Sequence, residues 1–218
     1  TLDSYGLFCY IKDIDRGLVW SATHQPAKTA ASRYLATFRP DRVEIERRDF
    51  GIGVRTEVGV APDDPVEVRH LTIVNHSSRN RRLELTSYAE LALSFGKLFV
   101  ETEYVTSPDA LLARRKPRSE HDPAVWAMQL LALPNAPQAA VAASGYETDR
   151  ARFIGRGHSL ESPQALEGEL TGSVGAVLDA IFSLRCQLKL APSEQVELAF
   201  VTGAAPSREE VLALAEKY

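Results

Sequence analysis

Two pairs of carboxylates are the first candidates for chemistry in this sequence. Asp63 and Asp64 precede Pro65, a pattern typical of a turn. Glu101 and Glu103 lie two residues apart in a strand-like stretch, so their side chains share one face. General acid catalysis needs one carboxyl group kept protonated by burial or by a neighbouring charge. Nothing elsewhere in the sequence marks a partner for either pair, so the pattern favours solvated carboxylates over a catalytic pair.

Histidine and cysteine give no sign of a metal or nucleotide site. The five histidines form no H-x-H or H-x-x-x-H pair, and Cys9 and Cys186 are too far apart in the sequence for a C-x-x-C motif. Both cysteines lie in apolar, strand-like stretches, which predicts two buried thiols. The segment Gly155–His158 is rich in glycine but lacks the lysine and hydroxyl residue of a phosphate-binding loop. We therefore expect no metal, no cofactor and no catalytic residue in this chain.

Sugar binding is the chemistry that the remaining residues suit best. A flat aromatic ring can pack against the C–H groups of a sugar, and Trp20 is followed by a polar run to Lys28. Arg156 and His158 lie in the glycine-rich segment, where a ligand can approach the backbone closely. Trp20 as a stacking platform, with Arg156 and His158 as hydrogen-bond donors, is the predicted carbohydrate site. The alternatives are a buried Trp20, an Arg156 salt bridge and a solvated His158, and the sequence favours these alternatives at all three positions.

Composition limits the class of protein. The chain has 218 residues, of which 44% are hydrophobic and 25% charged, as in a globular domain. Its net charge of −4 argues against a dedicated nucleic-acid-binding protein. It contains no apolar run near 18 residues and no signal peptide, so we expect no membrane span.

A two-residue period dominates the chain and predicts a large antiparallel β-sandwich. In Val43–Arg47, apolar and charged residues alternate as on a strand with one wet face. Two strand-like runs flank the polar residues 75–80 and together predict a hairpin or meander. Residues 145–168 are expected to form a long irregular loop. The expected strands cover residues 7–12, 17–22, 34–38, 43–47, 53–60, 65–74, 82–91, 98–106, 110–115, 125–131, 139–144, 169–174, 182–190 and 195–202.

The last element is predicted to be a helix. Ser207, with Glu210 three residues later, forms a capping box, in which both side chains satisfy free N–H groups of the first turn. Val211, Leu214, Ala215 and Tyr218 then make one apolar stripe at helical spacing. The stripe is unfinished at Tyr218, which is what we expect of a domain cut from a longer protein.

Several strings, in the same order along the chain, resemble the N-terminal domain of glycoside hydrolase family 94. Within that family they look most like the cyclic β-1,2-glucan synthase branch. They cover nearly the whole chain and include residues 10–13, 18–26, 65–75, 85–90, 97–103, 111–118, 150–157 and 175–179. The family has a longer stretch before the segment Lys97–Glu103, where this chain has only Leu91–Gly96.

The resemblance implies an all-β, galactose-mutarotase-like β-supersandwich over residues 1–205. It implies that residues 206–218 begin a helical linker to an (α/α)₆ catalytic barrel. That barrel, with the aspartate that protonates the glycosidic oxygen, is not in this sequence.

The implied function is that of a non-catalytic, carbohydrate-binding accessory domain of a glycan phosphorylase or a cyclic β-1,2-glucan synthase. The alternatives are an independent carbohydrate-binding module and a purely structural or dimerisation domain. The expected partners are a β-glucan or oligosaccharide, the missing barrel and a second copy in a homodimer, with no nucleic acid. The expected location is the cytoplasm, or the cytoplasmic side of a membrane protein if the parent is a cyclic glucan synthase.

Overall fold

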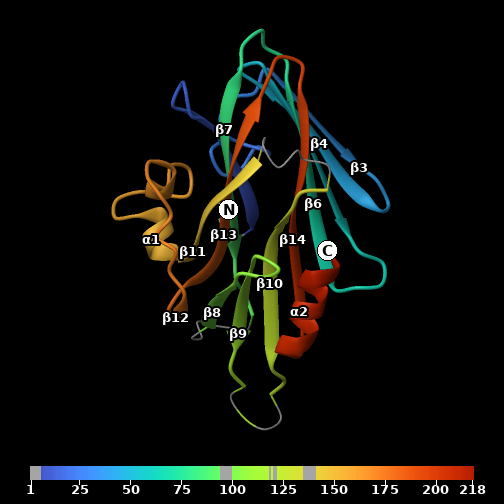
Figure 1. Cartoon of the computed structure of the whole chain (residues 1–218), viewed down its shortest axis with the longest axis vertical. Helices are drawn as coiled ribbons and strands as arrows, with labels where there is room; N and C mark the ends of the chain where they lie inside the picture. The colour runs from blue at the N-terminus through green and yellow to red at the C-terminus, as the bar shows by residue number, and fades with distance from the viewer. Residues whose placement is uncertain (1–5, 94–99, 118, 120–121, 135–140) are drawn as a thin grey trace.

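The computed structural model describes residues 6–93, 100–117, 119, 122–134 and 141–218. Within them the chain forms two antiparallel sheets that pack face to face (Figure 1). The five-stranded sheet has the order β11-β13-β7-β1-β2. The predicted all-β sandwich is confirmed. The strands of this sheet are β1 (Leu7–Asp13), β2 (Leu18–Ser21), β7 (Arg81–Glu90), β11 (Val141–Asp149) and β13 (Ala180–Leu190).

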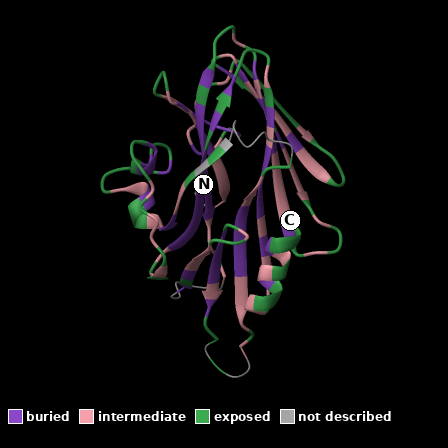
Figure 2. Ribbon diagram, in the orientation of Figure 1, coloured by how far each residue is buried: buried purple, intermediate pink, exposed green. Residues whose placement is uncertain are grey.

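The second sheet has nine strands in the order β12-β8-β9-β10-β14-β6-β5-β4-β3. It is wider than the first, and its edge strand β3 is exposed on both faces (Figure 2). Its strands are β3 (Arg33–Phe38), β4 (Arg42–Asp49), β5 (Ile52–Val60), β6 (Val66–Asn75), β8 (Val100–Val105), β9 (Ala110–Arg115), β10 (Val125–Ala132), β12 (Gly175–Val177) and β14 (Gln195–Ala205).

The main core lies between the two sheets. Alternate residues of each strand point inward, because successive side chains of a strand face opposite ways. Leu85 of β7, Phe182 of β13 and Leu198 of β14 belong to this core and are fully buried. The alternation that predicted the strands is therefore the pattern that fills the core.

The predicted hairpin around residues 75–80 is wrong. β6 pairs with β5 and β14, whereas β7 pairs with β1 and β13, so the chain crosses from one sheet to the other at this corner. Asn75 is buried there, and its amide nitrogen donates to the carbonyls of Arg79, Leu190 and Ala191 at 2.8, 3.1 and 3.0 Å. β6 and β7 each bury one face in the shared core, so they pack against each other across it instead of forming a hydrogen-bonded hairpin.

The region predicted as an irregular loop is partly regular. β11 continues to Asp149, and α1 (Arg150–Ile154) follows directly, capped by the Asp149 carboxylate. A 3-10 turn covers Gln164–Leu166. The predicted strand at 169–174 is wrong, because pairing with β8 begins only at Gly175. The predicted strands at 98–106 and 139–144 begin outside the described residues. Residues 94–96, Lys97–Phe99 and Arg118 of the family strings, and His121, also lie outside them.

The terminal helix is confirmed as α2 (Arg208–Lys217), and it lies against β10 and β14 (Figure 1). The Ser207 hydroxyl accepts a hydrogen bond from the Glu210 amide at 3.2 Å and donates to its carboxylate at 2.8 Å. Val211 and Ala215 are buried against Met128 of β10, while Leu214 and Tyr218 stay partly exposed. Among the helices of the described chain, none is long and apolar enough to cross a membrane.

Candidate functional site

Three of the four carboxylates singled out in the sequence, those of Asp64, Glu101 and Glu103, are paired with cations. Asp64 accepts hydrogen bonds from Lys217 and from the Tyr218 hydroxyl, which hold the pKa of its carboxyl group below the usual value. Glu101 accepts a hydrogen bond from Arg114, which likewise lowers its pKa. Glu103 pairs with Arg208 at 2.7 Å. A general acid needs a raised pKa, so Asp64 and Glu101 are suited to structural ion pairs instead.

The two cysteines are free thiols, and the prediction that both are buried holds for Cys186 but not for Cys9, which is partly exposed. Cys186 is buried, and desolvation raises its pKa to about 12. Burial also raises the pKa of the Cys9 thiol. A thiol in such surroundings stays protonated and is a poor nucleophile. Across the described ranges, no three His, Cys, Asp or Glu residues are arranged to hold a metal ion.

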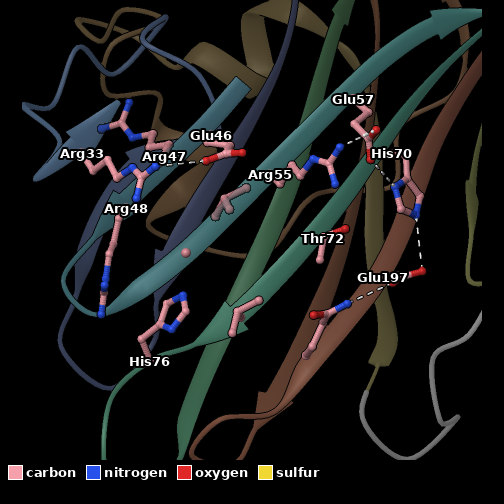
Figure 3. Close-up of a pocket in the computed structure, with 14 residues that line it drawn as sticks. Arg33, Glu46, Arg47, Arg48, Arg55, Glu57, His70, Thr72, His76 and Glu197 are labelled. Atoms are coloured by element: carbon pink, nitrogen blue, oxygen red, sulfur yellow. Dashed lines mark hydrogen bonds and ion pairs between the residues drawn. The ribbon is translucent and has the colours of Figure 1, made fainter. Parts of the chain in front are cut away.

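One hollow lies on the outer face of the nine-stranded sheet, and we call it the sheet groove (Figure 3). It has a volume of about 520 Å³ and is lined by residues of β3 to β6 and β14, together with His76. Gly53 forms part of its floor, where a Cβ atom would lie only 2.7 Å from Nε2 of His76. The missing side chain therefore lets the His76 ring lie against the strand.

Charges in the sheet groove neutralise one another along the strands. The His70 ring lies between the carboxylates of Glu57 and Glu197, with N–O distances of 3.7 Å on both sides (Figure 3). Glu57 also pairs with Arg55 at 3.0 Å and with Arg42 at 3.5 Å. The groove is open, and none of its lining side chains is aromatic apart from histidine. It resembles the solvated face of a sheet more than a built ligand site.

Trp20 is not the exposed stacking platform that the carbohydrate-site prediction requires. Its side chain is 0% exposed, it lies in the core between the sheets, and its ring packs edge-on against Phe50 at 5.6 Å between centroids. Trp20 pairs with Ile11 of β1, and both side chains point inward. The buried alternative is therefore correct. Ser21 ends β2 and is itself buried, and the polar residues from Thr23 onward belong to a loop beyond the strand.

His158 and the loop after Trp20 line the same cavity, which we call the loop cavity. It has a volume of about 410 Å³. Arg156 is exposed on the same loop but does not line the cavity. Of the three predicted site residues, only His158 lines this cavity. It does so together with the polar segment that follows Trp20. The lining residues are Phe8, Gln25, Pro26, Lys28, Arg150, Ile154, His158, Ser159, Leu160 and Glu161.

Residues 23–28 form the first wall of the loop cavity, and the buried Arg47 side chain anchors this segment. The Arg47 guanidinium donates to the backbone carbonyls of Thr23 and Thr29. It also forms a two-point ion pair with Asp49, at 2.6 and 3.0 Å, and both side chains are 1% exposed. A buried guanidinium with all these partners fixes both ends of the segment.

The second wall, residues 155–161, is anchored to the five-stranded sheet. The buried Tyr10 hydroxyl donates to the carbonyl of Leu160 at 2.7 Å. Gly155 ends α1 with a φ of 82°, and a Cβ atom there would clash with the Gln164 side chain. Phe153 and Leu160 pack on the outer face of that sheet with Tyr88. The loop therefore has its own small core beneath it.

Sequence reasoning missed the charged residues of this site. Lys28 and Glu161 form an ion pair between the two walls, and Arg150 is held by the Tyr88 hydroxyl at 3.0 Å and by Asp179 at 3.3 Å. No local pattern could have paired residues so far apart in the sequence. Arg47 did leave a signal, because it occupies an inward position of an alternating strand where an apolar residue is expected.

Comparison with known proteins agrees with the fold. The family model for the glycosyl hydrolase 94 supersandwich domain matches residues 1–218. A cyclic beta-(1,2)-glucan synthase, NdvB, from Rhizobium meliloti (strain 1021) is 30% identical over 228 residues, covering 99% of this chain. A solabiose phosphorylase from Paenibacillus borealis is 28% identical over 217 residues, covering 96% of this chain. Among solved structures, a bacterial glucoamylase complexed with acarbose aligns with a TM-score of 0.59 at 10% identity over 97% of this chain and 28% of its own, which supports the fold alone.

This chain spans only part of those relatives, 8% of the glucan synthase and 27% of the phosphorylase. The match to the supersandwich model nevertheless runs from the first residue to the last. With its two antiparallel sheets, the chain therefore belongs to the glycosyl hydrolase 94 supersandwich domain family.

Proposed function

We propose that this chain is a non-catalytic accessory domain of a larger glycan-processing protein, either a glycan phosphorylase or a cyclic β-1,2-glucan synthase. One observation carries the proposal. The supersandwich model accounts for all 218 residues, yet the chain covers only 8% and 27% of two relatives whose names state a glucan synthase and a phosphorylase. In this proposal, the catalytic residues lie in a separate (α/α)₆ barrel.

The state of the carboxylates supports the absence of catalysis by this domain. Among the described residues, the carboxyl groups with a shifted pKa all have it lowered by neighbouring arginine or lysine side chains. A group that donates a proton to a glycosidic oxygen needs a raised pKa instead. The carboxyl groups concerned are those of Asp15, Asp41, Glu44, Asp64 and Glu101.

The exposed stripe of α2 supports attachment to another domain. Leu214 and Tyr218 are only partly covered by β10 and β14, so the helix presents apolar surface for further packing.

An independent carbohydrate-binding module is the second candidate, and the loop cavity favours it. The two differ in the coding sequence after residue 218: the accessory role predicts a barrel there, and an independent module does not. For the accessory role we propose a cytoplasmic location, on the cytoplasmic side of the membrane if the parent is a cyclic glucan synthase.

The direct test is an activity assay of the purified chain. It is incubated with β-1,2-glucan and inorganic phosphate, and released sugar phosphate is measured beside a full-length phosphorylase of the family as positive control. We expect no sugar phosphate from the 218-residue chain. Release above the enzyme-free background would overturn the non-catalytic role.

A further inference from the structure

We propose that the loop cavity is the carbohydrate-binding site of this domain and that it takes a short neutral oligosaccharide. This inference rests on the proposed role in glycan processing and names the site and its ligand class. The cavity lies on the outer face of the five-stranded sheet, between the segments 23–28 and 155–161. Both segments overlap strings by which the sequence resembles its family, although those strings are more than 100 residues apart.

The size and the apolar walls of the cavity suit sugar rings. Its volume of about 410 Å³ lies in the range typical of small-molecule sites. Phe8, Pro26, Ile154 and Leu160 supply apolar surface against which the C–H faces of a sugar can pack. The Phe8 ring is held in place by stacking on Tyr88, with centroids 6.0 Å apart and an interplanar angle of 18°.

The polar groups suit hydroxyl recognition. Nδ1 of His158 lies 3.0 Å from the carbonyl oxygen of Ser162. A carbonyl only accepts, so Nδ1 carries the proton, and Nε2 of the neutral ring is left as an acceptor for a sugar hydroxyl. The Gln25 amide adds a donor and an acceptor, and Arg150 adds guanidinium donors.

The charge balance favours a neutral ligand over an anion. Lys28 and Glu161 cancel each other across the cavity. Arg150 is balanced by Asp179 and Glu90, at 3.3 and 3.9 Å. The lining charges thus have partners within the domain. A phosphate or an acidic sugar would have to compete with those carboxylates, whereas a polyol can add hydrogen bonds without breaking the pairs.

The test is titration calorimetry of the intact chain with β-1,2-gluco-oligosaccharides, and separately with inorganic phosphate. The variants are His158→Ala and Gln25→Ala, which truncate partly or fully exposed side chains and leave the core intact. His76→Ala, an equally exposed histidine in the sheet groove, is the matched control. Melting temperatures verify that each variant is folded.

We expect the oligosaccharide to bind the wild-type chain. Loss of a single hydrogen bond should weaken binding about three- to tenfold in each cavity variant, with no change in the control. An absence of binding heat at saturating sugar, an equal loss in His76→Ala, or tighter binding of phosphate alone would each overturn the proposal. The activity assay above is independent of these outcomes, so either proposal can fail without the other.

Discussion

The loop cavity and the sheet groove are built from the same kinds of residue, yet they differ in what supports them. Both contain arginine, glutamate and histidine. In the groove these side chains stand in rows on regular strands and pair with their neighbours. In the cavity they come from two loops that close around apolar walls, and each loop is tied down by a buried group beneath it.

The difference shows why charged residues alone are poor evidence of a site. An exposed ion pair on a sheet contributes about 0–1 kcal/mol and organises little. A buried guanidinium that holds two loop carbonyls fixes the position of a whole segment. Arg47 is the link between the two regions, because its strand, β4, belongs to the groove while its side chain supports the cavity.

The largest expected effect is that of Arg47→Met. The change removes both loop contacts and leaves the carboxylate of Asp49 buried without its cation, which should lower the free energy of unfolding by about 3–5 kcal/mol. Chemical denaturation measures this loss. Arg48→Met, on the exposed groove face of the same strand, is the control and should change stability by no more than about 0.5 kcal/mol. Equal effects of the two variants would remove the distinction between the regions.

A smaller effect is expected at the end of α1. Gly155→Ala places a Cβ atom against Gln164 on a backbone with a φ of 82°, and should cost about 1–3 kcal/mol. Gly157→Ala, two residues further on, has a φ of 80° but open space around its Cβ position, so it shares the strain without the clash. Thermal melts should therefore rank Gly155→Ala below Gly157→Ala, and the reverse order would contradict the described packing of this loop.

The smallest effect is expected in the groove. Glu57→Gln keeps the shape of the side chain and removes its pairs with Arg55, Arg42 and His70, all partly exposed. We expect a change of at most about 1 kcal/mol in stability and none in oligosaccharide affinity. A loss of sugar binding in this variant would move the functional site from the cavity to the groove.

The sequence predicts those elements that depend on local residue patterns, namely most strands and the terminal helix. The two-residue period locates most strands to within about two residues, and the capping box at Ser207 correctly predicts α2. The corner at Asn75 is not predictable in this way, because a polar turn between two strands looks the same whether they pair or cross between sheets. Trp20 is buried because it lies opposite Ile11 in the β1–β2 pair. The polar residues that follow Trp20 in the sequence give no sign of this pairing. The loop cavity depends on residues brought together only by the folded sandwich, and His158 alone of the predicted site lines it.

Whether sugar binds in the loop cavity is tested by an NMR titration of the isotope-labelled chain with a β-1,2-gluco-oligosaccharide. If the loop cavity is the sugar site, amide signals of residues 24, 25, 27, 28 and 155–161 shift with increasing sugar, while those of residues 53–57, 70–72 and 195–197 in the sheet groove stay in place. Shifts confined to the groove residues, or no shifts at saturating sugar, would contradict the account.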